Sequence, residues 1–209
     1  MVQRPSGQEL GDPRSLSVLV NKLRPLEPIR WVPEDLVMPQ GIENPSGHPV
    51  RAIAAGALAR MAAAAAAAGL PLQLVSGYRG FELQRSLFEG YSAEDGVAAA
   101  ETYSARPGHS EHQTGLAVDL DDGGGHAFES AFGETVTGRW LREHAPEFGF
   151  ILRYEQGEQP VVGYIYEPWH FRYVGAEIAL DMRAEGIINY EDYVGAEPAP
   201  DYAVESDAR

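Results

Sequence analysis

The sequence predicts an α+β fold in which a small, mainly antiparallel sheet is flanked by helices. Short segments with the alternating polarity of strands are mixed irregularly with longer helical segments, whereas a parallel sheet would need a regular βαβ succession. At 209 residues, with 44% hydrophobic and 22% charged side chains, the chain is long enough for one sizeable core. We therefore expect a single domain over residues 15–193, a flexible tail over residues 1–14 and an acidic, disordered tail over residues 194–209.

Proline, alanine and glycine set the expected structure of the first half. Five prolines within residues 15–47 exclude a long helix there and favour extended segments and turns. The Ala-rich residues 50–68 have high helix propensity, and Gly69 is placed to end that helix. A short strand is expected over residues 72–75, followed by a helix over residues 81–90.

The second half predicts three strands and two helices. Residues 116–120 alternate between apolar and smaller or polar side chains, as in a strand with one face on the core. A helix is expected over residues 134–144, where a proline soon follows. Two further strands are expected over residues 161–166 and 169–174, and a last helix over residues 176–185.

Charge and composition exclude several classes of protein. The 16 basic and 31 acidic residues give a formal net charge of −15, which repels nucleic-acid phosphates, so we expect no nucleic-acid partner. The chain has no cysteine, so any metal must be held by His, Asp and Glu. The apolar run Met61–Ala68 is far shorter than the ~20 residues that a membrane span needs, so we expect no membrane segment in this chain. We also expect a monomer.

The stretch around Gly115 places an imidazole and a carboxylate close to one turn. His112 precedes the turn, and Asp119 lies on the face of the following strand that points away from the core. His109 also precedes Asp119, so spacing alone leaves both histidines as candidates.

A second stretch, Glu167-Pro-Trp-His170, carries the same types of side chain. Trp169 can anchor a strand in the core while His170 points to the opposite face, and the kink at Pro168 lets Glu167 reach the same centre. Two imidazoles and one carboxylate leave a fourth zinc position for water, which is typical of a catalytic site. A glutamate that is not a ligand can then act as general base.

Each residue also has a more ordinary interpretation. A lone histidine is more often a surface or core side chain, and we interpret His48, His126 and His144 in this way. Asp119 alone could cap a turn, and Glu167 alone could be a solvated carboxylate. Spacing by itself does not decide between these interpretations and a metal site.

Taken together, the motifs resemble those of the VanY-type D-alanyl-D-alanine carboxypeptidases, a pattern shared with related L,D-carboxypeptidases of bacterial cell walls. The main matching residues are Ser110, His112, Gly115, Ala117, Asp119, Glu167, Trp169 and His170. Supporting matches are Ser76-Gly-Tyr-Arg79 with Gln84, and residues 148–154 and 169–174. The resemblance covers the chain from about Ser15 to Tyr193.

The resemblance implies a zinc ion held by His112, Asp119 and His170, and so selects His112 over His109. It implies that Glu167 is the general base. The implied reaction is hydrolysis of the terminal D-alanine of a peptidoglycan stem peptide, in an extracellular or wall-associated setting. No export signal is visible in the first residues, so such a signal would have been trimmed.

The resemblance also implies the substrate contacts. Arg79 is expected to face the active site, where a guanidinium can hold a substrate carboxylate or stabilise an oxyanion. Gln84 and Ser110 are expected to contact the peptide, while Arg153 and Tyr154 could either line the cleft or pack. Two alternatives stay open at this level: an endopeptidase of the same fold, and a non-catalytic wall-binding module in which zinc is structural.

Overall fold

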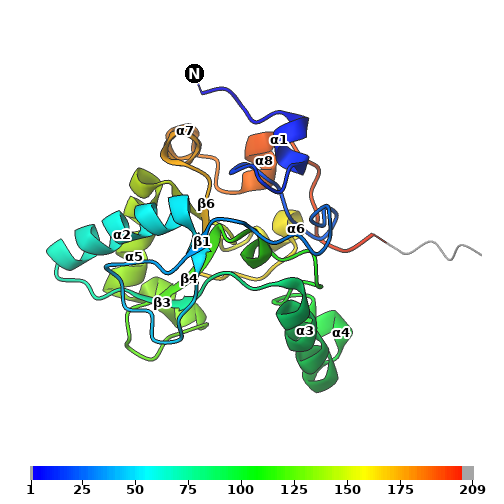
Figure 1. Cartoon of the computed structure of the whole chain (residues 1–209), viewed down its shortest axis with the longest axis horizontal. Coiled ribbons are helices and arrows are strands. Elements are labelled where there is room, and N and C mark those ends of the chain that lie inside the picture. Colours follow the sequence, from blue (N-terminus) through cyan, green and yellow to red (C-terminus); the bar gives the residue numbers. More distant parts are fainter. Residues whose placement is uncertain (1, 204–209) are drawn as a thin grey trace, which may run out of the picture.

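The structure is a computed structural model that describes residues 2–203, and it has the predicted α+β architecture. Its centre is a four-stranded antiparallel sheet in which every neighbouring pair runs antiparallel (Figure 1). In spatial order the strands are β3 (Gln73–Ser76), β4 (Ala117–Asp121), β6 (His170–Tyr173) and β5 (Phe150–Leu152). A separate two-stranded sheet pairs β1 (Leu36–Val37) with β2 (Val50–Arg51).

The main hydrophobic core lies on one face of the four-stranded sheet. The helices α2 (Ala52–Ala67) and α5 (Val136–His144) contribute buried side chains to it, among them Leu58 and Leu141. From the central strands come Leu116, Val118 and Leu120, and Trp169, Phe171 and Tyr173. These are the residues that strand alternation predicts for the apolar face, so the opposite face of β4 and β6 is left for polar side chains.

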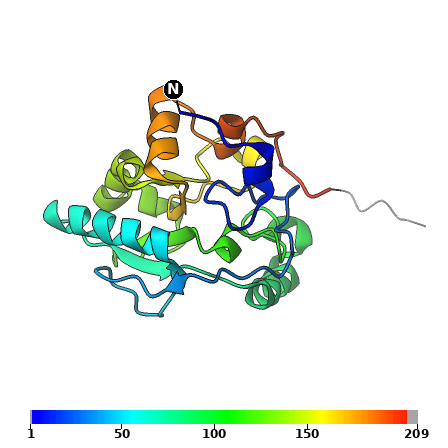
Figure 2. The same ribbon diagram turned by 45° about the horizontal axis from the view of Figure 1, so that its top comes forward.

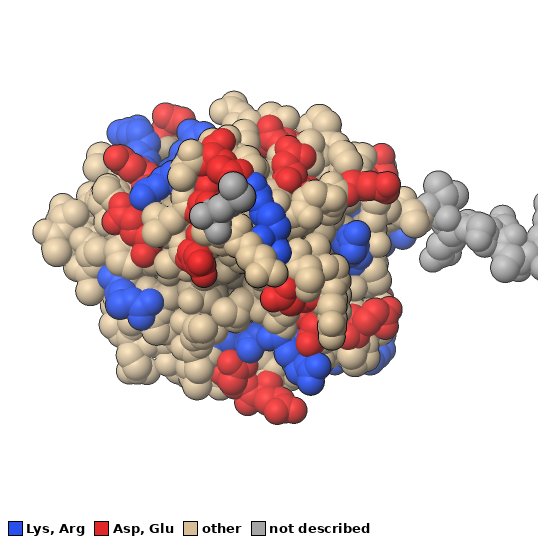
Figure 3. Space-filling view, turned by 90° about the horizontal axis from the view of Figure 1, so that it is seen from above, with Lys and Arg blue, Asp and Glu red and all other residues tan. Residues whose placement is uncertain are grey.

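The remaining helices surround this body. Helices α3 (Phe81–Asp95) and α4 (Val97–Ala100) lie at the end opposite α2 and α5 in both views (Figures 1 and 2). The others are α1 (Gly7–Gly11), α6 (Gln159–Val162), α7 (Ala176–Glu185) and α8 (Tyr190–Val194), with the 3-10 helices η1 (Glu111–Thr114), η2 (Ser130–Glu134) and η3 (Ala145–Phe148). Figure 3 shows acidic and basic side chains interspersed on one face of the molecule. No helix in residues 2–203 is long and apolar enough to span a membrane.

Most of the predicted elements are present, but the strand expected over residues 161–166 is wrong. This segment instead begins in α6, whose first turn contains Pro160, and leaves the helix at Gly163 with φ +85°. Proline is favourable at the start of a helix, and glycine adopts a positive φ without strain. The short strand β5 was not predicted.

The two expected tails are also corrected. At the N-terminus, Ser6 and Glu9 form a reciprocal capping box for α1, Leu10 is buried, and the guanidinium of Arg4 lies 3.6 Å from the centre of the Tyr193 ring. Figure 2 shows α1 beside α8. A Gly- and Pro-rich composition suggested flexibility, but one capped turn with a buried leucine is enough to dock the segment.

At the C-terminus, the acidic segment packs on the body as far as Tyr202. Ala199 is fully buried, Lys22 donates from Nζ to the Pro200 carbonyl at 2.9 Å, and the Arg106 amide donates to the Tyr202 hydroxyl at 2.7 Å. The part of the expected tail over residues 204–209 lies outside the described residues.

We expect Gly163→Ala to destabilise the protein by more than about 2 kcal/mol, because a Cβ there would meet the Ala199 carbonyl oxygen at 2.5 Å. Gly157→Ala is the matched control: its φ is also positive, at +90°, but the added Cβ has nothing within 4 Å. The control should cost only the backbone strain, roughly 1 kcal/mol. Urea unfolding measures both, and equal losses would contradict the packing of the C-terminal segment.

Candidate active site

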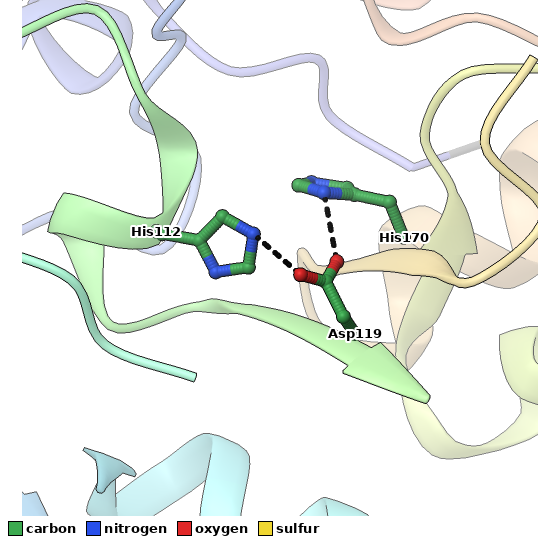
Figure 4. A group of neighbouring side chains, drawn as sticks. All are labelled: His112, Asp119 and His170. Atoms are coloured by element: carbon green, nitrogen blue, oxygen red, sulfur yellow. Dashed lines mark ion pairs between the residues drawn. The ribbon is translucent and has the colours of Figure 1, made fainter. Parts of the chain in front are cut away.

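The register of two central strands brings a carboxylate and an imidazole together. Asp119 on β4 is the direct partner of His170 on β6, so both side chains leave the sheet on its polar face. His112 comes from η1, which is followed by a turn in which Gly115 has φ +68°. Figure 4 shows the three side chains converging from these elements.

The three residues form a compact, buried cluster. His112 Nε2 lies 3.2 Å from Asp119 Oδ2, and His170 Nδ1 lies 3.2 Å from Asp119 Oδ1 (Figure 4). One ligand atom from each residue can be chosen so that all lie within 4.8 Å of one another. Within residues 2–203 this is the one such group of His, Asp and Glu that could hold a metal ion.

Outer contacts orient both imidazoles. Nδ1 of His112 donates to the Gly77 carbonyl at 2.7 Å, which leaves Nε2 with its lone pair towards Asp119. In His170 the other ring nitrogen, Nδ1, faces Asp119. The ring of Tyr154 lies against this imidazole, with the two ring centroids 4.7 Å apart.

Burial and charge shift the pKa values of these groups in different directions. Burial lowers the pKa of His112. For His170, burial lowers the pKa, but the neighbouring carboxylates of Asp119 and Glu111 outweigh it and raise the pKa to about 9. Burial would raise the pKa of Asp119, but the two imidazoles hold it far below its usual range. The carboxylate is therefore ionised at any physiological pH.

The donor set fits a zinc ion. Two imidazole nitrogens and one carboxylate oxygen are ligands that zinc accepts, and three protein ligands are typical of a catalytic site. Asp119 is 3% exposed, and its Oδ1 makes no aligned hydrogen bond although His170 Nδ1 lies 3.2 Å away. A buried carboxylate oxygen that lacks a hydrogen bond is costly unless a cation satisfies it.

Glu167 lies beside this cluster without belonging to it. Its carboxylate Oε2 is 3.8 Å from His170 Nδ1, and the residue is 6% exposed. Burial is the largest influence on this group and, with the negative charge of Asp119, raises the pKa of Glu167 to about 8. A carboxyl group whose pKa is raised into the neutral range is suited to exchanging protons with a reactant.

A cavity of about 300 Å³ opens onto the cluster, and the predicted substrate contacts line it. Arg79, Gln84 and Ser110 contribute to its wall together with the three candidate ligands and Glu167. Nε of Arg79 is buried without a hydrogen-bond partner, and no carboxylate in the described part of the chain forms an ion pair with this arginine. Its positive charge is therefore left for a ligand in the cavity.

Gln84 and Ser110 are both buried, and the Gln84 amide is held by a hydrogen bond. Nε2 of Gln84 donates to the Ala105 carbonyl at 2.7 Å, so the amide is held, and its Oε1 is buried without a hydrogen-bond partner. Ser110 is 5% exposed and immediately precedes η1. The unpartnered oxygen of Gln84 and the hydroxyl of Ser110 are therefore the side-chain groups of these two lining residues that a ligand could engage.

The structure places the three residues whose position the sequence left open, His109, Arg153 and Tyr154. His109 lies apart from the cluster, with Nδ1 2.9 Å from the Asn21 carbonyl oxygen and its ring against Tyr202. Tyr154 lines the cavity, whereas Arg153 is fully buried in ion pairs. Sequence reasoning missed Glu111, the residue next to His112, which is 1% exposed and ion-paired with Arg153 at 2.9 Å.

Comparison with known proteins accords with this geometry. The family described as VanY, D-alanyl-D-alanine carboxypeptidase, matches residues 47–176. This chain belongs to the VanY family. Membership makes it a carboxypeptidase of the peptidoglycan type.

Individual relatives extend the match. The putative carboxypeptidase YodJ of Bacillus subtilis is 38% identical over 191 residues, which cover 89% of this chain and 69% of the relative. A D-alanyl-D-alanine carboxypeptidase of Enterococcus faecalis is 40% identical over 64% of this chain, and this spans about half (51%) of that relative's length.

Solved structures are similar over most of both chains. The LdcB LD-carboxypeptidase superposes with a TM-score of 0.81 at 36% identity and covers 88% of each chain. A mutant of the vancomycin-resistance D,D-pentapeptidase VanY, in complex with Zn(II), has a TM-score of 0.72 at 34% identity and covers 87% of this chain and 99% of its own.

The raised pKa of Glu167 predicts a specific pH dependence of stability in the protein freed of metal by a chelator. Unfolding lets this carboxyl ionise near its ordinary pKa of 4.5, whereas the folded state holds the proton up to about pH 8. The wild type should therefore lose stability as pH rises from 5 to 8, at up to ~1.4 kcal/mol for each pKa unit of the shift. Glu167→Gln should remove this loss.

Urea unfolding at several pH values measures the effect. The free energy of unfolding of Glu167→Gln relative to wild type should rise between pH 5 and 8 and level off above. Glu177→Gln, which changes an exposed carboxylate on α7, should follow the wild type. A pH-independent difference for Glu167→Gln would contradict the buried position of this carboxyl.

Proposed function

We propose that this chain is a zinc-dependent carboxypeptidase that removes the terminal D-alanine from peptidoglycan stem peptides. The observation that carries the proposal is the convergence of three elements on one cavity: the His112–Asp119–His170 cluster, the buried Glu167 and the unpaired Arg79. The relatives named above support it, because they include D-alanyl-D-alanine and L,D-carboxypeptidases and a VanY structure with Zn(II).

In this proposal His112 Nε2, His170 Nδ1 and one oxygen of Asp119 hold the metal. When bound, zinc supplies Lewis-acid polarisation of the scissile carbonyl and lowers the pKa of an attacking water to ~7. The charge of a bound zinc ion would also lower the pKa of the neighbouring Glu167, which favours its ionised carboxylate.

The protein's own groups then have separate tasks. The Glu167 carboxylate accepts a proton from the attacking water and donates it to the nitrogen of the leaving D-alanine. Arg79 binds the terminal carboxylate or the oxyanion that develops on the scissile carbonyl, for which its unpaired guanidinium is suited. Gln84 and Ser110 orient the peptide through the amide oxygen and the hydroxyl that face the cavity.

The proposal also sets where the protein acts. Its substrate is a wall component, so we expect an extracellular or wall-associated setting, and relatives named for wall peptides support this. Both D,D- and L,D-carboxypeptidases are among the relatives. The bond cleaved is therefore a peptide bond to a terminal D-alanine, preceded by either a D- or an L-centre.

Glu167→Ala should reduce alanine release by about 10²- to 10⁴-fold, because it removes the group that moves the proton. Zinc content should stay near one equivalent per chain, because Glu167 is not a ligand. Liquid chromatography of defined tri-, tetra- and pentapeptide stems measures the release, and metal analysis after dialysis measures the zinc. Glu177→Ala, at an exposed site on α7, should leave both unchanged.

These measurements distinguish a carboxypeptidase from an endopeptidase and from a non-catalytic module in which zinc is structural. Stem cleavage without release of terminal alanine would indicate an endopeptidase. Bound zinc with no cleavage of any stem would indicate a structural site. Unchanged turnover of Glu167→Ala would exclude this residue as the base.

Arg79→Gln should lower kcat/KM by about 10²- to 10³-fold while zinc content is retained, because the cavity loses its unpaired positive charge. Arg79→Lys should recover only part of this loss, since an ammonium lacks the planar fork that matches a carboxylate. Arg85→Gln, at an exposed position on the same helix as Gln84, is the control. If Arg79→Gln matched the control, a role for Arg79 in substrate binding would be ruled out.

A further inference from the structure

The two oxygens of Glu111 have different partners. Oε1 accepts hydrogen bonds from Arg153 Nε and from Arg172 Nη1, both at 2.9 Å. For Oε2, the one hydrogen-bond partner within residues 2–203 is His170 Nε2, at 3.4 Å. The side chains of Glu111 and both arginines are completely buried. One oxygen is thus anchored by two cations, and the other is aimed at a candidate metal ligand.

The two arginines are fixed in turn by groups from distant parts of the chain. Arg172 Nη2 donates to the carbonyl oxygens of Leu16 and Val18 at 3.1 and 2.7 Å. Arg153 makes a two-pronged contact with Glu191 on α8, at 2.8 and 2.7 Å. Two carboxylates thus balance two guanidiniums, as a buried cluster of charges requires.

The imidazoles of His112 and His170 present opposite nitrogens to Asp119. His112 is held through Nδ1 by a neutral carbonyl, whereas His170 can be held through Nε2 by the carboxylate of Glu111. A histidine binds a metal only through the nitrogen that carries no proton, and the acceptor on its other side selects that tautomer.

We propose that Glu111 is a positioning residue for His170. Its Oε2 accepts the Nε2 proton, so that Nδ1 keeps its lone pair for the metal. This rests on the proposed function, which supplies the metal. Leu16, Val18 and Glu191 all lie outside residues 47–176, the range matched by the VanY family. The buried ion cluster around Glu111 therefore extends into the segments that flank the family core.

The substitution Glu111→Gln reverses the polarity of this contact at nearly constant volume. The two guanidiniums donate to the Oε1 position, so they should hold the amide oxygen there and turn the amide NH₂ towards His170. An NH₂ donor favours the tautomer with a lone pair on Nε2 and the proton on Nδ1. This is the wrong tautomer for a ligand that uses Nδ1.

We expect Glu111→Gln to weaken zinc binding by about 10- to 100-fold, as measured by competition with a chromophoric chelator. Glu191→Gln is the matched control, because it removes the same charge from the same buried cluster but leaves the contact between Glu111 and His170 in place. Its zinc affinity should stay within about threefold of wild type. Equal weakening by both substitutions, or none by Glu111→Gln, would overturn the proposal.

A second pair of variants guards against a failure to fold. Two double variants each remove one positive and one negative charge: Glu111→Gln combined with Arg153→Gln, and Glu191→Gln combined with Arg153→Gln. The double variant that contains Glu111→Gln should lose zinc affinity, and the one that contains Glu191→Gln should keep it. In the zinc-loaded wild type, ¹⁵N NMR of the His170 ring should show the proton on Nε2, and a proton on Nδ1 would refute the assignment.

The measurements also separate this inference from the proposed function. If the wild type binds no zinc, the proposed function fails. If the wild type binds zinc and Glu111→Gln binds it equally well, only the role of Glu111 fails.

Discussion

The pairing of β4 with β6 is the constraint on which the site depends. Asp119 stands opposite His170 in this register, and the flanking pairs are Val118 with Phe171 and Ala117 with Arg172. The alternation of strands then sends the apolar members into the core and the polar members to the other face. A slip of one residue would turn His170 into the core, so the packing of the apolar face and the geometry of the site are specified by the same contacts.

On the polar face, ionisable groups are buried at a density that ordinary cores avoid. The charges of Glu111, Glu191, Arg153 and Arg172 balance one another, which keeps the cost of removing them from water tolerable. Asp119 and Glu167 illustrate how position decides protonation: two imidazoles hold the pKa of Asp119 far below its usual range, while burial raises that of Glu167 to about 8. Two carboxyl groups that contact the same imidazole are thereby suited to different tasks.

The sequence predicted the parts of the site that obey local periodicity. Strand alternation was enough to put Asp119 and His170 on one face. The preference for His112 over His109 needed the family resemblance, because the four residues of η1 are too few to show a periodicity in the sequence. Glu111 was missed because its partners Arg153, His170 and Arg172 lie 42 to 61 positions further along the chain. The acidic C-terminal segment was misjudged from its composition, although Tyr202 within it is a side chain that a solvated tail has little use for.

The hydrogen bond between Asn21 and Glu191 joins residues that are 170 positions apart. Contacts of such long range close late in folding, because the chain must first lose the entropy of the intervening loop. Arg153 cannot make its full set of ion pairs until α8 has docked, and Glu191 on α8 follows Arg153 by 38 positions in the chain. The buried ion cluster is therefore completed only after synthesis has passed Glu191.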